Sequence, residues 1–455
     1  MYDVVIIGGG PGGYAAALYA HNFGLSVALI EKDRVGGTCL LRGCIPAKAW
    51  LQTAEVFSQV KRAGEFGVQT SEPSLDWSAA LARKQSVVEG LVNGLSGLLK
   101  TRGVDVIDGF GRIENGGVVV DTAEGAKTIE AKNIILATGS VPRTIPGYER
   151  QDTRIVTSDE ALDWESQPQR VAIIGAGAIG CEFASLLGDF GSEVHLFEVA
   201  DQVVPGLEPE AAKVLERALK KKKIKVYTGT GVGSPEMIDG GVRVAYGDKS
   251  VDVDVVLVAV GRAPVTDNLG LDGTSVEVDR GFVKVDPATM QTAQPGIYAV
   301  GDIVAGAPQL AHAGFAEGIS AITHIATGET AAVDYRAIPL VVYTHPEVAS
   351  VGLTEAQATA AGMDVTTTDH GMRGVGRAII QGETGGVVKI VSEVDGPIIG
   401  ATVAGPGAGE MIHELMYAVA WEALPAEAAA FIHAHPTVSE AIGETLLAAA
   451  GRPLH

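Results

Sequence analysis

The sequence predicts an α/β protein composed of several domains. Its 455 residues are more than one hydrophobic core usually organises, and about 150 residues per domain suggests about three domains. The 46% hydrophobic content and the 59 glycines are typical of a folded chain with many tight turns between strands and helices. A pattern of strand, glycine-rich turn, helix and strand occurs twice, beginning at Tyr2 and at Arg170.

Composition and charge also exclude some partners. The formal net charge of −21 argues against a broad basic surface, which supplies most non-specific affinity for nucleic acids and anionic lipids. Apolar runs such as VVLVAVG at residues 255–261 are strand-length and fall short of the roughly 20 residues that cross a bilayer. The first residues, MYDVVIIGGG, enter a strand without a basic leader. We therefore expect no nucleic acid, no membrane association and a cytoplasmic location.

The two copies of the repeated pattern keep the same internal spacing. The first reads YDVVIIGGGPGGYAAALYAHNFGLSVALIE and the second reads RVAIIGAGAIGCEFASLLGDFGSEVHLFE. A shift of 167 positions, the difference between 175 and 8, superimposes the three turn glycines, a glycine after the helix and the acid after the second strand. The matched pairs are Gly8 and Gly175, Gly10 and Gly177, Gly13 and Gly180, Gly24 and Gly191, and Glu31 and Glu198.

Each turn glycine has a physical reason in a dinucleotide-binding unit. The first permits the bend, the second lets the backbone approach a pyrophosphate, and the third lets the helix pack on the strand. The helix N-terminus then faces negative charge. A single glycine turn can also occur where nothing binds, but two copies in full context predict two bound dinucleotides.

The acid after each second strand indicates which sugar is bound. A carboxylate there accepts hydrogen bonds from ribose hydroxyls and repels a 2′-phosphate. In the second copy, FEVADQV offers Glu198 and no arginine close behind it, which favours NAD over NADP. The alternative is that Glu198 is only a solvated acid at a strand end.

The segment GGTCLLRGCIPAK at residues 36–48 holds two of the three cysteines. Cys39 and Cys44 would lie about 8.7 Å apart by Cα in a regular helix, whereas a disulfide tolerates only about 7 Å. If they bond, the chain must leave helical geometry between them, which Gly43 permits, and Pro46 suits the start of a following helix. Such a strained bond predicts a redox-active disulfide.

Two other interpretations of the cysteine pair are open. They could be two free core thiols, or two ligands of a metal site. The metal is poorly supported because four residues between ligands with no nearby histidine is not a usual zinc spacing. The only other cysteine, Cys181, lies in the predicted helix of the second copy and is interpreted as a small apolar residue.

The whole chain resembles the flavin-dependent disulfide oxidoreductases, and among them the branch that reoxidises dihydrolipoyl groups. The resemblance rests on GGGPGGYAAA, GGTCLLRGCIPAK, ATGSVPR, GAGAIGCEFAS, GIYAVGD, LAHAGFAEG, YTHPEVASVGLTE and HAHPTVSE. Two departures are Ala47, where GCIPSK commonly has serine, and Gly314 with Phe315; neither position has an evident chemical role.

The resemblance implies FAD in the first unit and NAD in the second. Asp302 would hold the ribityl chain, and Lys48 would pair with Glu182 near the isoalloxazine ring. The other residues implied for FAD are Gly8, Gly10, Gly13, Glu31, Thr38, Thr138, Gly139, Ser140 and Ala311. Those implied for NAD are Gly175, Gly177, Gly180, Glu198 and Gly261.

The resemblance also implies the catalytic roles. Cys39 would exchange with substrate, Cys44 would face the flavin, and His435 would be the acid–base group, oriented by Glu440. A histidine suits this role because it takes up and releases protons near neutral pH. The alternatives are that His435 is a bystander or binds a metal with His433, although no third ligand has an obvious spacing. In the family this histidine reaches the partner subunit's disulfide, which implies an obligate homodimer.

The predicted fold therefore has two Rossmann-like domains and a C-terminal α+β dimerisation domain. The expected FAD domain comprises residues 1–142 and 267–334, the NAD domain residues 143–266, and the dimerisation domain residues 335–455. The expected partners are a second copy of the chain and the lipoyl-bearing domains of 2-oxoacid dehydrogenase or glycine-cleavage complexes. No metal is expected.

Four other functions are alternatives to dihydrolipoyl oxidation. Glutathione-type reductases need NADP-reading arginines after the second unit, and none is found there. Mercuric and large thioredoxin reductases need a further cysteine pair, which the tail LLAAAGRPLH lacks. A non-catalytic scaffold subunit has no need of Cys39, Cys44, His435 and Glu440 together.

Overall fold

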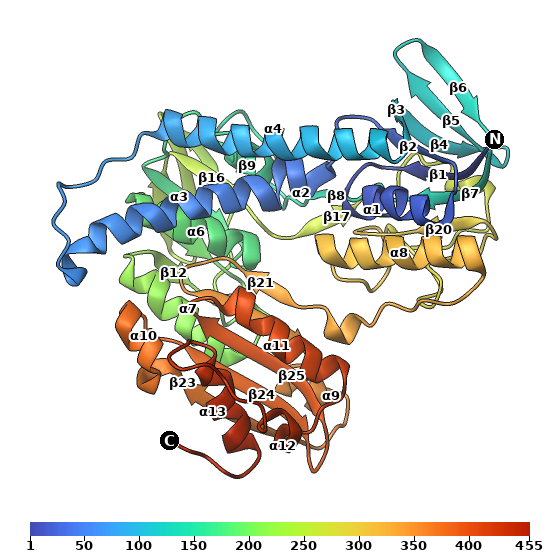
Figure 1. Cartoon of the computed structure of the whole chain (residues 1–455). Coiled ribbons are helices and arrows are strands. Elements are labelled where there is room, and N and C mark those ends of the chain that lie inside the picture. The colour runs from blue at the N-terminus through green and yellow to red at the C-terminus, as the bar shows by residue number, and fades with distance from the viewer. The chain divides into compact units, whose positions relative to one another are not determined.

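The computed structural model describes residues 1–455 and divides into two compact units (Figure 1). Unit 1 comprises Met1–Ala49, Leu81–Arg143 and Arg262–Tyr335. Unit 2 comprises Trp50–Ala80, Thr144–Gly261 and Arg336–His455. No helix in either unit combines the length and the apolar character needed to span a membrane.

A five-stranded parallel sheet forms the centre of unit 1, in the order β20-β7-β1-β2-β3. The strand β1 lies in the middle, with Ile7 paired to Ile30 on one side and to Leu136 on the other. Its residues are apolar on both faces because helices and loops cover both sides of such a sheet. The strands are β1 (Tyr2–Ile7), β2 (Val27–Glu31), β3 (Asp105–Asp108), β7 (Ala131–Leu136) and β20 (Ile297–Ala299).

Two helices from distant parts of the sequence, α1 (Pro11–Ala20) and α8 (Ala311–Thr327), lie side by side on this sheet (Figure 1). Glycines make the contact very close. A Cβ atom on Gly314 would lie 3.3 Å from Gly12 N, and one on Gly318 would lie 2.7 Å from Gly12 O. Phe315 packs on Tyr14, with ring centroids 5.6 Å apart. Packing therefore explains Gly314 and Phe315, for which the sequence suggested no role.

The remaining elements of unit 1 surround the parallel sheet. They include a three-stranded antiparallel sheet and two short strand pairs, which carry loops toward the first glycine turn. These elements are η1 (His21–Phe23), α2 (Gly37–Arg42), β4 (Phe110–Glu114), β5 (Gly117–Thr122), β6 (Gly125–Ile129), β8 (Ser140–Pro142), β17 (Arg262–Pro264), η3 (Leu271–Gly273), β18 (Val278–Asp279) and β19 (Phe282–Val283). Three helices continue across the division between the units: α3 (Cys44–Arg62), α4 (Trp77–Thr101) and η4 (Tyr335–Ala337).

A second five-stranded parallel sheet lies in unit 2, in the order β12-β11-β10-β16-β9. It repeats the design of the first sheet, because β10 and β11 occupy the places of β1 and β2 and the helix α6 follows the glycine turn. Its elements are β9 (Ile155–Thr157), α5 (Ser158–Ala161), β10 (Arg170–Ile174), α6 (Ala178–Phe190), β11 (Glu193–Phe197), α7 (Pro209–Lys221), β12 (Lys225–Tyr227) and β16 (Val255–Val258). An antiparallel sheet, β13 (Glu236–Ile238), β14 (Gly241–Tyr246) and β15 (Lys249–Val253), packs on it.

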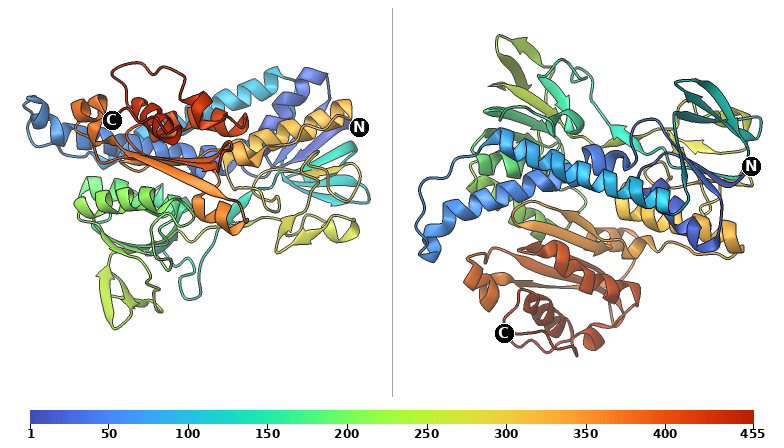
Figure 2. Two further views of the ribbon diagram at one scale, coloured as in Figure 1. Left: turned by 90° about the horizontal axis from the view of Figure 1, so that it is seen from below. Right: turned by 45° about the horizontal axis from the view of Figure 1, so that its top comes forward.

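The C-terminal part of unit 2 is an antiparallel sheet in the order β21-β22-β25-β24-β23. The helices α11 and α13 cover one face and α7 packs on the other, as Figure 2 shows. Its strands are β21 (Leu340–Val342), β22 (Glu347–Gly352), β23 (Val365–Gly371), β24 (Val387–Glu393) and β25 (Ile398–Gly405). Its helices are α9 (Glu355–Ala360), η5 (Met372–Gly374), α10 (Gly376–Gln381), α11 (Ala408–Ala420), α12 (Pro425–Ala428) and α13 (Glu440–Ala449). Unit 2 also contains η2 (Ala63–Phe66), earlier in the chain. The predicted class, α/β with a C-terminal α+β part, is confirmed.

An ion cluster around the buried Lys389 joins the C-terminal sheet of unit 2 to the starts of α7 and α9. The Lys389 ammonium on β24 contacts Glu208 at 2.9 Å, Glu210 at 3.2 Å and Glu355 at 2.7 Å. Burial lowers the pKa of Lys389, but the hydrogen bonds that its ammonium donates to Glu355 and Glu208 outweigh this effect, so the pKa lies above its usual range. Glu208 also precedes α7 and accepts the Glu355 backbone N–H at 2.7 Å. A charged lysine is therefore stable here because three carboxylates surround it.

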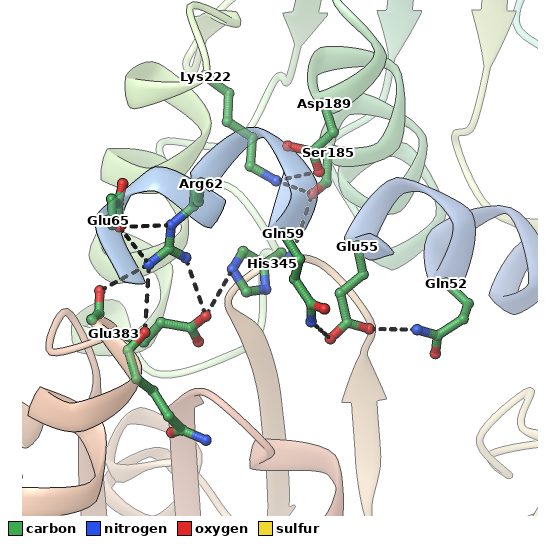
Figure 3. Close-up of polar contacts among 12 residues, drawn as sticks. Gln52, Glu55, Gln59, Arg62, Glu65, Ser185, Asp189, Lys222, His345 and Glu383 are labelled. Atoms are coloured by element: carbon green, nitrogen blue, oxygen red, sulfur yellow. Dashed lines mark hydrogen bonds and ion pairs between the residues drawn. The ribbon is translucent and has the colours of Figure 1, made fainter. Parts of the chain in front are cut away.

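Polar contacts in unit 2 also join α3, α6 and the segment before β22 (Figure 3). The Arg62 guanidinium lies 3.4 Å from the Glu383 carboxylate, which also lies 3.4 Å from the His345 ring. Ser185 accepts the His345 backbone N–H at 3.3 Å and the Lys222 ammonium at 2.9 Å. The helix α6, which begins at the second glycine turn, is thereby anchored to the C-terminal sheet.

Candidate active site

The first glycine turn joins β1 to α1 in unit 1. Gly8 has a φ of +110°, which only glycine adopts easily. A Cβ atom on Gly13 would lie 1.9 Å from Gly8 O, so this position also requires glycine. Gly10 is the N-cap of α1, and a Cβ atom there would meet only Gly37 Cα, at 3.8 Å. The first and third glycines shape the turn, and the second leaves the helix N-terminus accessible.

The second turn, between β10 and α6 in unit 2, has the same geometry. Gly175 has a φ of +100°, and a Cβ atom on Gly180 would lie 1.9 Å from Gly175 O. Gly177 is the N-cap of α6, with nothing within 4 Å of where its Cβ would be. Both helix N-termini therefore have room for an anionic group beside their N–H groups, and these residues fit the pyrophosphate of a dinucleotide. The glycine repeat is thus a repeat in three dimensions.

The two acids also make matching contacts. Glu31 accepts the backbone N–H of Gly9 at 2.7 Å and that of Asp33 at 2.9 Å. Glu198 accepts the N–H of Ala176 at 2.7 Å and that of Ala200 at 2.9 Å. Each carboxylate thus binds the backbone of its own glycine turn, and its remaining lone pairs can accept ribose hydroxyls. Glu198 is only 8% exposed, so the alternative of a solvated strand-end acid is wrong.

The cysteine segment leaves helical geometry between the two sulfurs, as predicted. The helix α2 ends at Arg42, and Gly43 has φ −146° and ψ −111°, outside the helical region. The helix α3 begins at Cys44, with Pro46 as its third residue. A Cβ atom on Gly43 would lie 2.9 Å from Thr38 O, so the close approach of the two helices favours glycine.

Cys39 and Cys44 are thiols in direct contact across this break. A hydrogen bond with Cys44, followed by burial, raises the pKa of the Cys39 thiol well above its usual range, and the Lys48 ammonium acts in the opposite direction. Cys44 is exposed, so the alternative of two core thiols is wrong. No group of three or more His, Cys, Asp or Glu side chains is arranged to hold a metal ion.

The cysteine helix begins against the first glycine turn. The Gly36 N–H donates to Gly9 O at 2.8 Å, and a Cβ atom on Gly37 would lie 2.5 Å from Gly10 Cα. Tyr14 on α1 is partly buried, which raises the pKa of its phenol, and the two nearby cysteines raise it further. The redox candidates and the first dinucleotide turn therefore form one site in unit 1.

A hydrogen-bonded chain connects three of the residues implied for FAD. The Ser140 hydroxyl donates to the Asp302 carboxylate at 2.5 Å, and the Arg262 Nε donates to the Ser140 Oγ at 2.7 Å. The Arg262 guanidinium also donates to Thr38 Oγ1 at 3.4 Å and lies 4.0 Å from the Asp302 carboxylate. No sequence motif predicts a role for Arg262, although it directly follows Gly261 in the segment VGRAP.

The other implied FAD residues lie on loops and helix ends of unit 1. Thr138 donates to Val265 O at 2.5 Å, and Gly139 has a φ of +71° and accepts the Val265 N–H at 2.9 Å. Ala311 is the first residue of α8. Unit 1 therefore contains the glycine turn, the N-terminus of the second helix α8, and the hydrogen-bonded chain described above.

In unit 2, Glu182 and Gly261 belong to the second dinucleotide-binding unit. Glu182 is buried on α6 and accepts the Tyr343 backbone N–H at 3.0 Å. Gly261 has a φ of +105° and follows β16. Cys181 is buried beside Glu182 and donates to Ala176 O at 3.2 Å; burial raises the pKa of this thiol to about 12, which suits an inert core residue.

His435 and Glu440 contact each other in unit 2, at the start of α13. The His435 Nδ1 lies 2.8 Å from one Glu440 oxygen, and the Thr437 N–H donates to the other at 2.8 Å. These two hydrogen bonds, that of His435 first, lower the pKa of the Glu440 carboxyl. Because the carboxylate can only accept, Nδ1 carries the proton and Nε2 is left to accept another.

The second histidine of this segment has a different partner. The His433 Nε2 lies 2.7 Å from the Glu414 carboxylate, whose hydrogen bond raises the pKa of His433. The pair belongs to no group of side chains arranged for a metal ion. His433 therefore supports the loop, and the more exposed His435 is the better candidate for proton transfer.

Comparison with known proteins agrees with this geometry. Residues 2–318 match the family model described as pyridine nucleotide-disulphide oxidoreductase, and residues 338–446 match the dimerisation domain of that family. The chain is 40% identical to a dihydrolipoyl dehydrogenase of Bacillus subtilis, over 100% of this chain and 99% of that protein. It is 39% identical to mitochondrial dihydrolipoyl dehydrogenase 1 of Arabidopsis thaliana, over 100% and 91%.

Solved structures have the same fold. LpdA from Mycobacterium tuberculosis has a TM-score of 0.90 at 28% identity, covering 97% of this chain and 98% of that one. The Cu(II) complex of the flavoprotein disulfide reductase RclA from Escherichia coli has a TM-score of 0.87 at 27% identity, covering 98% of each chain.

These similarities extend over both units. Enzymes of this kind use FAD and NAD, and the chain has one glycine turn with its acid for each of two dinucleotides. The C-terminal match accounts for the antiparallel sheet as a dimerisation domain and supports a homodimer. The chain belongs to the pyridine nucleotide-disulphide oxidoreductase family, and it is a flavoprotein oxidoreductase.

Proposed function

We propose that this enzyme oxidises protein-bound dihydrolipoamide to lipoamide and reduces NAD to NADH, the activity named in its relatives. The observation that carries the proposal is the contact between Cys39 and Cys44 at the helix break, directly against the first glycine turn. A disulfide formed there can exchange with a substrate dithiol on one side and connect with a bound dinucleotide on the other.

The proposed substrate step is two thiol–disulfide exchanges. One dihydrolipoyl thiolate attacks Cys39 of the disulfide, so the Cys39–Cys44 bond breaks and a mixed disulfide forms. The second lipoyl thiol then attacks the lipoyl sulfur of that mixed disulfide. The bond to Cys39 breaks, and oxidised lipoamide is released. The enzyme is left with two thiols, and the substrate has lost two electrons and two protons.

His435 is the proposed base for this step. A thiol must lose its proton before it attacks, and the Cys39–Cys44 disulfide that it attacks has no group that can accept this proton. Glu440 fixes the Nδ1 proton of His435, so Nε2 can take the substrate's proton. By resemblance to the family, His435 would act on the disulfide of the partner subunit.

We further propose which residues hold the cofactors. FAD, when bound, supplies the two-electron chemistry that connects the thiol pair with NAD. Gly8, Gly10, Gly13 and Glu31 would hold its dinucleotide part, and Asp302, fixed by Ser140 and Arg262, would accept the ribityl hydroxyls. The remaining proposed contacts to FAD are Thr38, Lys48, Thr138, Gly139 and Ala311, with Glu182 proposed as the partner of Lys48 near the isoalloxazine ring. Those to NAD are Gly175, Gly177, Gly180, Glu198 and Gly261.

We also retain the three-domain division as a proposal, with FAD bound by residues 1–142 and 267–334, NAD by residues 143–266, and dimerisation through residues 335–455. Lipoyl-bearing domains of 2-oxoacid dehydrogenase or glycine-cleavage complexes are the proposed partners, and the cytoplasm is the proposed location. A reducing compartment suits a cysteine pair that cycles between thiols and disulfide.

The test is a turnover assay with the purified enzyme. Dihydrolipoamide is supplied with NAD or with NADP while absorbance of the reduced nicotinamide is recorded, and bound flavin is measured in the same sample. We expect turnover with NAD and at least about tenfold less with NADP, because the Glu198 carboxylate would repel a 2′-phosphate and the segment after it has no arginine. No turnover with either nucleotide, with flavin bound, would favour a scaffold subunit instead.

An Ile432→Asp variant is expected to weaken the homodimer. Ile432 is 97% exposed and lies three residues before His435 in the C-terminal domain, so the partner subunit is the natural cover for its side chain. Burying an isoleucine contributes about 1.5–3 kcal/mol, and a dimer contains two copies. We therefore expect the dimer Kd to rise about 100-fold or more, measured by light scattering over a dilution series.

The matched control for this variant is Val278→Asp, whose side chain is 44% exposed on β18, outside the proposed dimerisation domain. It should leave the dimer Kd within about threefold of the wild type. An Ile432→Asp protein that dimerises as tightly as the control would remove Ile432 from the interface.

A further inference from the structure

The buried carboxylate of Glu317 makes contacts that the proposed mechanism does not use. Glu317 lies in the middle of α8 and is 0% exposed. One of its oxygens accepts the backbone N–H of Gly301 at 2.5 Å, and the other accepts the Tyr335 hydroxyl at 2.8 Å. A carboxylate buried without a cation is unusual, because removing a charge from water is costly unless hydrogen bonds compensate.

Gly301 is the residue directly before Asp302. It has a φ of +79° and ends the strand segment from which the Asp302 side chain projects toward Ser140. The hydrogen bond from Gly301 N–H to Glu317 therefore fixes the backbone of this turn. The Asp302 side chain is fixed separately, because its carboxylate accepts the Ser140 hydroxyl.

Close packing fixes the position of Glu317 itself. The glycines on either side of it along α8, Gly314 and Gly318, are the ones that contact Gly12 on α1. A helix held this tightly cannot slide, so the Glu317 carboxylate stays aligned with the Gly301 N–H. The same helix supports the first glycine turn and the Asp302 turn.

The charges around Glu317 favour its neutral form. Burial raises its pKa to about 7, the Asp302 carboxylate adds to the rise, and the hydrogen bonds from Gly301 and Tyr335 oppose it. The facing titratable groups are Asp302 on the turn and Tyr335 on η4, whereas α1 presents Gly12 and Ala16. The Arg262 guanidinium lies 4.0 Å from the Asp302 carboxylate and makes no ion pair with Glu317.

We propose that Glu317 is a positioning residue for FAD: its ionised carboxylate fixes the Gly301–Asp302 turn, and its protonation loosens that turn. The proposal rests on the assignment of Asp302 to the ribityl chain of FAD. A charged acceptor makes a shorter and stronger hydrogen bond than a neutral one. The enzyme therefore holds FAD more firmly above neutral pH than below it.

The first test measures how FAD affinity depends on pH. Holoenzyme is diluted at pH values from 5.5 to 8.5, and released flavin is measured by its fluorescence. For the wild type we expect the FAD Kd to rise about five- to tenfold as the pH falls below about 7. For Glu317→Gln, whose amide oxygen is a neutral acceptor at every pH, we expect the higher Kd throughout and no pH step.

The control is Glu329→Gln, an exposed glutamate just after α8. It should reproduce the wild-type Kd and the wild-type pH step. If Glu317→Gln also keeps the wild-type step, the proposal is wrong.

A second measurement separates positioning from a merely structural role. A carboxyl group whose pKa is higher in the folded protein than in the unfolded protein stabilises the folded state at pH values below its unfolded pKa. This stabilisation is lost as the pH rises through its folded pKa. At pH 8 the full-length Glu317→Gln chain, stripped of flavin, should therefore have a Tm equal to or above that of the wild type, although it binds FAD more weakly. A lower Tm together with weaker binding would indicate a structural role instead.

The Tyr335→Phe variant tests the same idea without changing Glu317. It removes a hydrogen bond that lowers the pKa of Glu317, so the pH step in FAD affinity should move to higher pH. A step that stays in place, or moves to lower pH, would contradict the proposal.

An Asp302→Asn variant distinguishes failure of this inference from failure of the proposed site. If Asp302→Asn lowers FAD affinity and Glu317→Gln does not, Asp302 binds FAD and the inference about Glu317 is wrong. If Asp302→Asn binds FAD as tightly as the wild type does, the assignment of Asp302 itself is wrong.

Discussion

A Cys44→Ser variant is expected to lose dihydrolipoamide turnover by roughly a thousandfold or more, the scale seen when a group that forms a covalent bond in the reaction is removed. Serine cannot form the bond to Cys39, so the enzyme has no disulfide to exchange with substrate. The fold should tolerate the change, because Cys44 is exposed at the first residue of α3 and serine is nearly the same size.

The measurement compares turnover and bound flavin in the same preparation. Cys44→Ser should keep its FAD, since Gly8, Glu31 and Asp302 are unchanged, while reduction of NAD by dihydrolipoamide disappears. Val56→Ser places the same residue at an exposed position on the same helix and should retain wild-type turnover. If Cys44→Ser turns over within about tenfold of the wild type, the Cys39–Cys44 pair does not take part in the reaction.

A His435→Gln variant is expected to lose about 10²–10⁴-fold in turnover, the usual contribution of a general acid–base group. Glutamine can still meet Glu440 through its amide, but it cannot take a proton from the substrate thiol. The Glu440→Gln variant should lose less, because it misorients the imidazole without removing it. Turnover is measured under saturating NAD across the pH range.

The pH profile tests the assignment of the base. The hydrogen bonds from His435 and Thr437 lower the pKa of Glu440, so Glu440 stays ionised through the neutral range and cannot cause a change there. A general base acts only in its unprotonated form. Wild-type turnover should therefore fall as the pH is lowered, and the residual turnover of His435→Gln should lack that fall.

His433→Gln is the matched control, since the same residue type lies two positions earlier and contacts Glu414 instead. It should keep turnover within about tenfold of the wild type. If the His433→Gln and His435→Gln variants lose equal amounts of turnover, the loss comes from a changed loop conformation and not from removal of His435 as the base.

Local geometry made the two glycine turns and the cysteine break predictable from the sequence. Gly8 needs a positive φ, and Gly13 cannot carry a Cβ atom 1.9 Å from Gly8 O, so no other residue can take these places. The same constraints recur at Gly175 and Gly180. The break in helical geometry at Gly43 was predictable on the condition that Cys39 and Cys44 bond, because residues five apart in a helix have Cα atoms too far apart for a disulfide.

Contacts between distant segments left no comparable signal. Arg262 meets Ser140 across 122 residues, and Glu317 meets Gly301 because the chain folds α8 back under the turn. The acids Glu31 and Glu198 were predicted as ribose acceptors, but their hydrogen bonds to the glycine-turn backbone were not. The spacing of these residues in the sequence does not predict such contacts, because the partners depend on how whole helices and strands pack.

The sequence by itself determined the fold class, the repeated dinucleotide-binding units and the redox cysteine segment. These features depend on φ angles, helix periodicity and the room around single residues, all of which are local. Only the tertiary structure decided which side chains hold Asp302 in place and why Gly314 and Gly318 are glycines. Those outcomes depend on helix packing and on burial of charge, which arise only when segments more than a hundred residues apart come together.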